Sequence, residues 1–268
     1  MTKRLYHIII ICLTAGVASC HTETSKPESE TPEEDTYTEL SEENLKETST
    51  EIKNLNTEWP EEWRAGIIVS KEAVENYGLE NCFISDTISD KVFERINGIS
   101  YREDCPVKRG KLRHIRLIHH DNDGNIRLGE IICNEKIADD IKEVFKIFYE
   151  SGYKVESVRL IDEFDGDDEA SMRANNTSCF NFRKKTTGSN LSKHAYGMAI
   201  DINPLYNPYI KKKTGKIQPL EGKPYLDRSK EFPYKIDSKD LAYKEFTKRG
   251  YKWGGSWRFT KDYQHFEK

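Results

Sequence analysis

Apolar residues recur every three or four positions in two segments of the chain, and this spacing predicts two amphipathic helices. In the segment 137–149 the apolar positions fall on one helical face, and Gly152 follows where glycine commonly ends a helix. In the segment 88–96 three branched apolar residues stand four positions apart. A third helix is predicted over 241–249, ending at Gly250.

Polar and apolar residues alternate over 114–119 and 126–133, which is the pattern of half-buried strands. The intervening Asp121–Gly124 is a hairpin turn signal. Two further strands are predicted over 155–161 and 198–202. Because helices and strands follow one another without regular alternation, we predict an α+β fold. It would be a single compact domain with a small antiparallel sheet flanked by helices.

The N-terminus has the pattern of an export signal. A basic start, Thr2–Arg4, precedes an apolar run from Leu5 to Ala18. This run is shorter than the roughly 20 residues that a membrane-spanning helix needs, so residues 1–19 are predicted to be a signal peptide. The small residues before Cys20 resemble the lipobox of bacterial lipoproteins, in which the cysteine is lipid-modified. We therefore expect a protein of the cell envelope that is anchored to a membrane through lipid on Cys20.

Charge is distributed unevenly along the chain. Residues 21–59 contain 12 acidic and 3 basic side chains and few apolar ones. Such a composition cannot bury enough surface to offset the entropy of ordering, so residues 20–59 are predicted to be a flexible tether. The net charge is −4 for all 268 residues, but about +3 for the predicted folded domain, 60–268. A mildly basic domain suits an anionic wall polymer and lacks the basic footprint of a nucleic-acid binder. We expect a monomer.

The predicted domain contains four cysteines, at positions 82, 105, 133 and 179. An exported protein can oxidise them, and four cysteines allow three pairings. We predict a Cys82–Cys105 disulfide because both residues lie in the loop-rich early region. A zinc site made of cysteines is not expected, since no Cys-x-x-Cys pair is present.

The C-terminal third supplies the side chains of a hydrolytic zinc site. Such a site needs three protein ligands, an open position for water and a base. His194, Asp201 and His265 can be the ligands, and Asp262 the base. The chain must fold back between His194 and Asp201, because their tips have to meet at one ion. Gly197 is the expected bend.

Asp262 and His265 are three positions apart, so on a strand they would point to opposite faces. On a tight or helical turn they would share one side, as a base beside a metal requires. We predict a turn between them, although a bulge would have the same effect.

Two motifs in this order resemble the D-alanyl-D-alanine carboxypeptidase family of zinc peptidases. The first is Ser192-x-His194-x-x-Gly197-x-Ala199-x-Asp201, and the second is Asp262-x-x-His265. The family includes VanY-type carboxypeptidases, VanX-type dipeptidases and phage L-alanyl-D-glutamate endopeptidases. The segment 253–257, Trp-Gly-Gly-Ser-Trp, which precedes the second motif, is also similar to the corresponding segment of family members. The resemblance extends over about 85–268, with the metal-site core in 171–268.

The resemblance implies a role for each matching residue. His194, Asp201 and His265 would bind Zn²⁺, Asp262 would be the general base, and Ser192 would lie near the terminal carboxylate of the substrate.

An upstream arginine would stabilise the developing oxyanion. Arg183 is preferred because it is closer in sequence to the ligands, and Arg173 is the alternative, with a role in substrate binding. The usual Ser-x-Tyr-Arg segment of the family is not present in clear form, so this assignment stays open.

The function implied is a zinc-dependent peptidase that hydrolyses peptidoglycan stem peptides, with D-alanyl-D-alanine carboxypeptidase action as the first choice. An L-alanyl-D-glutamate-type endopeptidase is the alternative within the class. A non-catalytic cell-wall binding lipoprotein is the alternative outside it. Asp262 argues against the binder, because a structural zinc is usually closed by a fourth Cys or His.

The lipobox generates a first prediction. Replacing Cys20 with Ser should abolish incorporation of labelled fatty acid and release the protein from membranes, because the acylated thiol is lost. Metabolic labelling followed by membrane fractionation measures both effects. Absence of lipid label in the unsubstituted protein would contradict the prediction.

Overall fold

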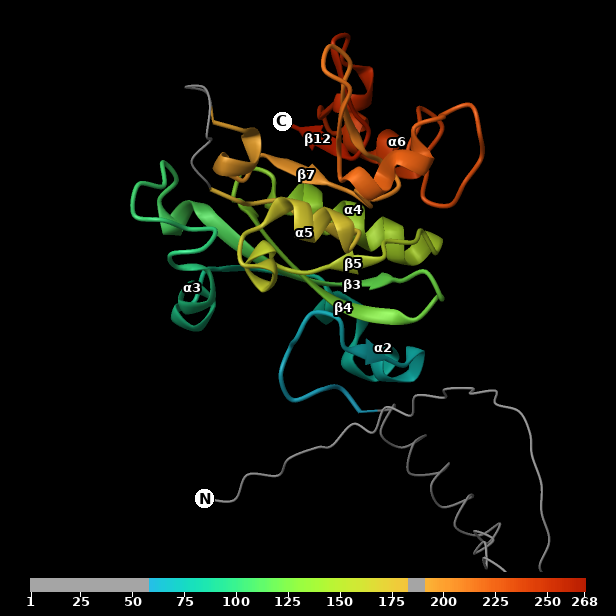
Figure 1. Ribbon diagram of the computed structural model, residues 1–268. Coiled ribbons are helices and arrows are strands. Elements are labelled where there is room, and N and C mark those ends of the chain that lie inside the picture. Colours follow the sequence, from blue (N-terminus) through green and yellow to red (C-terminus); the bar gives the residue numbers. More distant parts are fainter. Residues whose placement is uncertain (1–57, 183–190) are drawn as a thin grey trace, which may run out of the picture.

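The computed structural model describes residues 58–182 and 191–268, which form an α+β fold (Figure 1). The helices are α2 (Lys71–Tyr77), α3 (Asp90–Ile96), α4 (Ala138–Ser151), α5 (Asp168–Arg173) and α6 (Leu241–Lys248). The longer strands are β2 (Ile84–Thr87), β3 (Leu112–His120) and β4 (Ile126–Asn134). The short strands are β1 (Ile68–Val69), β5 (Ser157–Val158), β6 (Asn176–Thr177), β7 (Ala199–Asp201), β8 (Tyr209–Lys211), β9 (Lys216–Gln218), β10 (Lys252–Trp253), β11 (Thr260–Asp262) and β12 (His265–Glu267). Short 3₁₀ helices include η3 (Ile161–Phe164) and η4 (Lys193–Tyr196).

A four-stranded antiparallel sheet of order β1-β4-β3-β2 forms the N-terminal half. Its centre is the predicted hairpin, in which β3 and β4 pair along nine residues each. Asp121 stabilises the turn, because its carboxylate accepts from the backbone N–H groups of Asp123 and Asn125. Gly124 adopts a φ of 85° there. The hairpin prediction is confirmed.

The helix predicted over 137–149 is confirmed as α4, with its apolar face buried as the spacing indicated. Gly152 ends it with a φ of 68° and donates to the last carbonyls. The helix lies between the four-stranded sheet and α6 (Figure 1). Phe148 of α4 meets Phe246 of α6, with ring centroids 6.3 Å apart. Burying such a ring stabilises the fold by about 1.5–3 kcal/mol.

The C-terminal half contains two more antiparallel sheets, β10-β12-β7 and β11-β8-β9, and β5 pairs in parallel with β6. The strand predicted over 155–161 is shorter than expected. The amide oxygen of Asn176 accepts from the backbone N–H of Arg159, which ends the β5–β6 ladder, and the chain then turns into η3.

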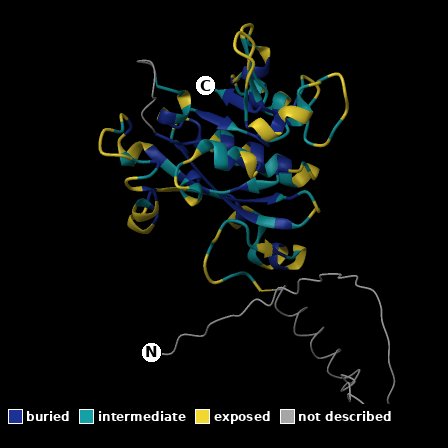
Figure 2. Ribbon diagram, viewed as in Figure 1, coloured by how far each residue is buried: buried dark blue, intermediate teal, exposed yellow. Residues whose placement is uncertain are grey.

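Two apolar clusters form the core, visible as the dark interior in Figure 2. The larger one joins the sheet, α4, α6, β7 and β12. The smaller one packs α3 against the ends of β3 and β4. The helix predicted over 88–96 is confirmed as α3, where Ser89 accepts from the N–H of Val92 at the N-terminus.

The cysteines at 82, 105, 133 and 179 are all free thiols, so the predicted Cys82–Cys105 disulfide is wrong. The reason is their placement in the two clusters: Cys82 is buried in the larger one, and Cys105 packs against the smaller one. Burial raises the pKa of Cys82 to about 12, so this thiol is unreactive at neutral pH.

The predicted signal peptide, Cys20 and nearly all of the predicted tether lie outside the described residues. Among the helices in the described ranges, none combines the length and the apolar content that crossing a bilayer would require.

The adjacent pair His119 and His120 does not share a site, as strand alternation predicts. His119 is buried and its Nδ1 lies 2.6 Å from the carbonyl oxygen of Val155, whereas His120 stacks on Tyr149 at the surface end of the strand. Burial lowers the pKa of His119 from 6.5 to about 4.

This depressed pKa predicts an acid-sensitive fold. Between pH 6.5 and 4 the unfolded chain binds a proton at position 119 that the folded protein excludes. The unfolding free energy should therefore fall with pH by up to about 1.4 kcal/mol per unit from this site. Urea unfolding at pH 7 and pH 5 should show a smaller pH dependence for His119→Gln than for the unsubstituted protein. Equal pH dependence in both proteins would contradict the assignment.

Candidate metal centre

Antiparallel pairing of β7 with β12 places Asp201 directly opposite His265. The next pair, Ile200 and Phe266, points to the other face and lies in the core. Side chains alternate along a strand, so packing Ile200 and Phe266 into the core directs Asp201 and His265 together to the opposite face, toward the pocket. Their facing atoms, Oδ1 and Nδ1, are 3.0 Å apart.

His194 reaches the same point from η4, the 3₁₀ helix that precedes β7. Ser192 begins this helix, with its hydroxyl oxygen accepting from the His194 N–H at 3.3 Å. Gly197 ends it with a φ of 64°. A Cβ at position 197 would lie 2.7 Å from the backbone nitrogen of Asn134, so only glycine fits. The bend predicted at Gly197 is confirmed.

The three side chains fit a tetrahedral metal ion. Nε2 of His194 lies 3.1 Å from Nδ1 of His265 and 3.3 Å from Oδ1 of Asp201. Donor atoms bound at 2.0–2.2 Å to a tetrahedral ion are about 3.3–3.6 Å apart, so these side chains would have to separate by only a few tenths of an ångström to hold one. Within the described residues, this is the group of three His, Cys, Asp or Glu side chains close enough to hold an ion.

Outer hydrogen bonds fix which ring nitrogen each histidine presents. Nδ1–H of His194 donates to the carbonyl oxygen of Cys179 at 2.6 Å, which leaves Nε2 for the ion. Nε2–H of His265 donates to the Glu267 carboxylate at 3.3 Å, which leaves Nδ1. Such partners orient the ring and raise its basicity as a ligand. Sequence reasoning missed this role of Glu267, although its position two residues after His265 on a strand places both on one face.

The electrostatics of the cluster favour a bound cation. Burial opposes the charge on Asp201, but the neighbouring His194 and His265 hold the pKa of its carboxyl well below the usual range. Burial also opposes protonation of His265, yet hydrogen bonds with Asp201 and Glu267 raise its pKa to about 10. A metal ion would take the place of the proton, since ligands bind in their deprotonated form.

Asp262 enters the site from a different sheet. It ends β11, opposite Tyr209 of β8, and a bend at 263–264 leads to His265 at the start of β12. The turn predicted between Asp262 and His265 is therefore confirmed, although it joins two strands and contains no helical turn. Asp262 and His265 thus face one pocket from two sheets.

The carboxylate of Asp262 has the character of a base. Its Oδ1 is buried and has no hydrogen-bond partner among the described residues. Burial raises its pKa to about 7, near the value at which a general base works best at neutral pH. Gly254 packs directly against it, because a Cβ there would lie 2.7 Å from the Asp262 Cβ and 2.6 Å from its carbonyl oxygen. This contact explains why the chain has glycine before the second motif.

A pocket of about 380 Å³ opens over the cluster. Its walls include Ser192, Met172, Trp257 and Tyr209, which come from four separate segments. The indole of Trp257 lies 5.3 Å from the His265 ring. Sequence reasoning did not identify Met172 or Tyr209, because nothing in the local sequence links them to the motifs.

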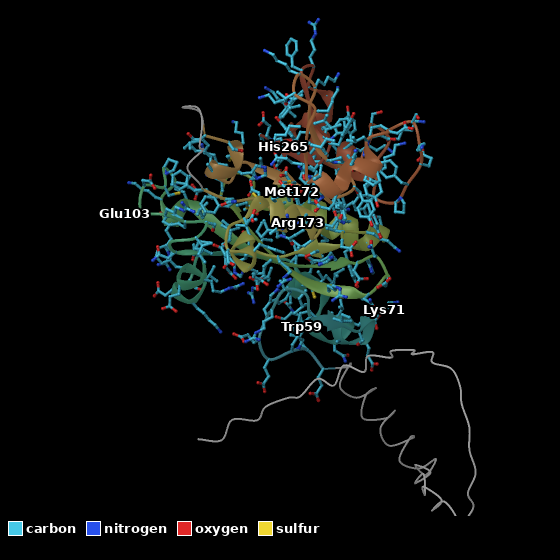
Figure 3. The ribbon with its side chains drawn as sticks, in the orientation of Figure 1. Trp59, Lys71, Glu103, Met172, Arg173 and His265 are labelled. Carbon is cyan, nitrogen blue, oxygen red and sulfur yellow. The ribbon has the colours of Figure 1, made fainter. Side chains whose placement is uncertain are left out.

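The structure brings together five of the residues predicted for the site, namely Ser192, His194, Asp201, Asp262 and His265. It does not bring Arg173 to them. That residue, labelled in Figure 3, lies exposed in the last turn of α5. Its neighbour Met172 lines the pocket. Arg183 lies outside the described residues.

Comparison with known proteins agrees with this geometry. Residues 185–268 match the family model described as D-alanyl-D-alanine carboxypeptidase. No curated protein and no solved structure matches the chain. The matched segment includes His194, Asp201, Asp262 and His265 together with the bend at Gly197. The C-terminal segment of the chain, residues 185–268, is thus similar to the D-alanyl-D-alanine carboxypeptidase family of zinc peptidases.

Proposed function

We propose that this protein is a zinc-dependent D-alanyl-D-alanine carboxypeptidase, which removes the last D-alanine from peptidoglycan stem peptides. The observation that carries the proposal is the orphaned carboxylate of Asp262 beside three converging ligand atoms in one pocket. A purely structural metal site would be closed by a fourth ligand. Here the fourth side is an open pocket with a base at its wall.

His194, Asp201 and His265 would hold the ion, and zinc when bound supplies positive charge that polarises a carbonyl and acidifies water. Asp262 would take the proton of the attacking water and return it to the leaving amine. Its raised pKa suits both steps, because the group must accept a proton and then release it. Burial of Asp262 also keeps bulk water from competing for its free oxygen.

Ser192 and Lys193 stand at the same pocket, where they would receive the terminal carboxylate of the substrate. The Ser192 oxygen accepts from the backbone at His194, so its own hydrogen is free to donate to a ligand. These two groups favour carboxypeptidase over endopeptidase action. We retain Arg183 as the proposed oxyanion-stabilising residue.

We further propose that the enzyme acts as a monomer at the cell envelope, anchored to a membrane through lipid on Cys20. The predicted acidic tether would give the catalytic domain reach into the wall polymer.

Zinc binding by the three ligands is the first test. The purified protein should contain about one zinc per chain, and single replacement of His194, Asp201 or His265 by Ala should remove it. Elemental analysis after gel filtration measures the stoichiometry, and circular dichroism checks the fold. Full zinc content in all three variants would contradict the ligand assignment.

The second test separates enzyme from binder. Asp262→Asn keeps the size of the side chain but cannot accept a proton. We expect normal zinc content and a turnover on purified muropeptides that is about 10²–10⁴ times lower. Asp165→Asn, at an exposed loop position, is the matched control and should keep full activity. Mass spectrometry of the products identifies the bond: loss of one D-alanine supports the proposal, whereas cleavage into a muramyl-L-alanine fragment and a peptide that begins with D-glutamate would indicate endopeptidase action.

If Asp262→Asn loses zinc, Asp262 is a ligand and the base lies elsewhere. If the variant keeps full activity, Asp262 is not the base.

The hydrogen bond between Glu267 and His265 provides a third test of the metal site. Glu267→Gln should weaken zinc binding about 10–100-fold, because the ring loses the carboxylate that orients it. Competition with a chelator measures the affinity directly. Glu221→Gln, at an exposed position outside the pocket, should leave it unchanged. Equal affinity in both variants would show that Glu267 does not support the ligand.

A further inference from the structure

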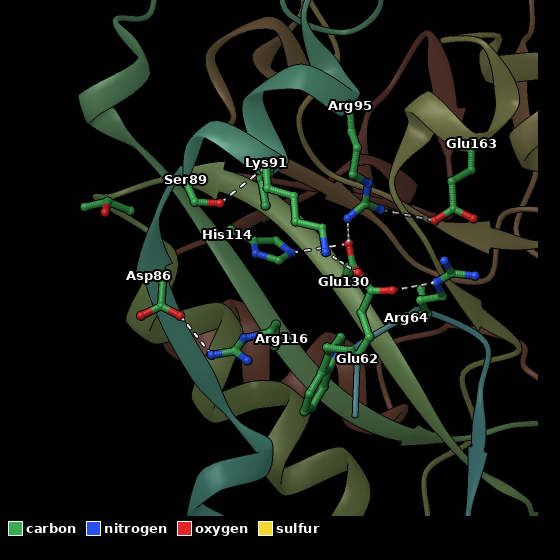
Figure 4. A pocket seen from close by; sticks show the side chains of 14 residues that line it. Glu62, Arg64, Asp86, Ser89, Lys91, Arg95, His114, Arg116, Glu130 and Glu163 are labelled. Atoms are coloured by element: carbon green, nitrogen blue, oxygen red, sulfur yellow. Dashed lines mark hydrogen bonds and ion pairs between the residues drawn. The ribbon is translucent and has the colours of Figure 1, made fainter. Parts of the chain in front are cut away.

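A second cavity lies on the N-terminal sheet. Its volume is about 830 Å³, against about 380 Å³ for the pocket over the candidate metal centre, and the two have no lining residue in common. Strands β2, β3 and β4 form its floor, α3 forms one wall, and the segment 62–65 forms another (Figure 4). Nothing in the proposed hydrolysis uses it.

A buried ion network fixes the floor of this cavity. Glu130 is only 1% exposed, and its Oε2 lies 2.8 Å from Nη1 of Arg95 and 3.3 Å from Nε2 of His114. Figure 4 shows both side chains directed at it. An unpaired buried carboxylate would be costly, so these contacts hold Arg95 and His114 in place. The charge of Glu130 is thereby satisfied within the protein and is not available to a ligand.

The guanidinium of Arg116 has N–H groups that are not used in contacts within the described residues. Arg116 stands opposite Glu130 in the β3–β4 register, so its side chain rises from the same face of the sheet. Its guanidinium lies 5.4 Å from the ring centroid of Trp63, and Trp63 is itself held by a hydrogen bond from Nε1 to the Gly129 carbonyl oxygen at 3.1 Å. One nitrogen, Nη2, pairs with Asp86 at 3.0 Å. The Nε and Nη1 groups of Arg116 have no partner among the described residues.

A guanidinium in this state is suited to a carboxylate. Its planar fork is oriented by the indole beneath it, so little conformational freedom remains to be lost on binding. Nη2 carries a second N–H beside the one that pairs with Asp86, and it runs parallel to an N–H of Nε or Nη1, so two N–H groups can match the two oxygens of a carboxylate. The indole next to it offers an apolar surface for a short aliphatic side chain.

The remaining charges in the cavity are balanced. Four cations, Arg64, Lys91, Arg95 and Arg116, face four carboxylates, Glu62, Asp86, Glu130 and Glu163. Glu62 and Asp86 are about half exposed, on opposite sides of Arg116 (Figure 4). Glu62 already pairs with Lys91 and Arg64, whereas Asp86 pairs with Arg116 through Oδ2 alone and keeps Oδ1 for the ammonium group of a ligand.

We propose that this cavity is a second, non-catalytic binding site for a short zwitterionic peptide. The peptide carboxylate would bind the free N–H groups of Arg116, and its ammonium group would lie by Asp86. If the proposed function holds, the ligand is an uncleaved stem peptide of the wall polymer. Binding at two places on one polymer raises the effective concentration of substrate at the catalytic pocket.

The test uses the tripeptide L-Ala-γ-D-Glu-L-Lys, which has two carboxylates, two ammonium groups and no D-alanyl-D-alanine bond. Calorimetric titration into the zinc-loaded full chain with Asp262→Asn avoids turnover. Adding Arg116→Gln should weaken binding by about tenfold or more, and Arg116→Lys should weaken it less, because Lys keeps the charge but loses the fork. Arg113→Gln is the matched control, since Arg113 lies on the other face of β3 and pairs with Glu135.

A second probe, the same tripeptide with its carboxyl groups amidated, tests the contact itself. It should bind more weakly than the free acid to the Arg116 protein, but the two probes should bind equally to Arg116→Gln. If Arg116→Gln fails to fold, the same comparison is made with Arg116→Lys, which should show a smaller difference between the probes than Arg116 does.

The inference would be overturned if Arg116→Gln bound the free acid as tightly as the protein with Arg116. It would also be overturned if Arg116→Lys preferred the free acid over the amidated peptide as strongly as the protein with Arg116. If the unsubstituted protein hydrolyses no muropeptide while Arg116→Gln still weakens binding, the proposed function fails and this binding site stands.

Discussion

The pairing of β7 with β12 is the constraint on which the candidate metal centre depends. These two strands are each three residues long, and their register sets both the core and the site. Ile200 and Phe266 face inward, and Phe266 stacks on Phe246 with ring centroids 4.8 Å apart. A slip of one residue would exchange the two faces. It would turn the two ligands toward the apolar core and move the two apolar side chains to the pocket face, so the hydrophobic core enforces the ligand geometry.

Helix α4 connects the β7–β12 pair to the rest of the molecule through packing contacts. One of its faces packs on β3, and Phe148 meets Phe246 of α6, which in turn supports Phe266. The N-terminal hairpin thereby acts as the platform on which the short C-terminal strands are held. Strands of two or three residues have little stability of their own, and this packing explains why the site needs the first half of the chain, which the matched family segment does not include.

The two polar cavities use buried charge in different ways. At the metal centre, the carboxylate of Asp201 is shared by two histidines, and one oxygen of the Asp262 carboxylate has no hydrogen-bond partner among the described residues. In the cavity over the N-terminal sheet, Glu130 is fully paired, and the N–H groups available to a ligand are those of Arg116. The first arrangement favours a cation, and the second favours a ligand carboxylate beside an ammonium group.

The sequence by itself determined the local features of this protein. Periodicity located α3, α4 and the β3–β4 hairpin, because burial of one face depends on spacing alone. The motif spacing identified the three candidate ligands, Asp262 and the bend at Gly197. The extent of β5, the free state of Cys82 and Cys105, the outer partner Glu267 and the exposure of Arg173 were decided by tertiary structure. So was the cavity around Arg116, which joins β2, β3, β4, α3 and residues 62–65. Each of these depends on which distant segments pack together, and that is set by the shape of the whole core.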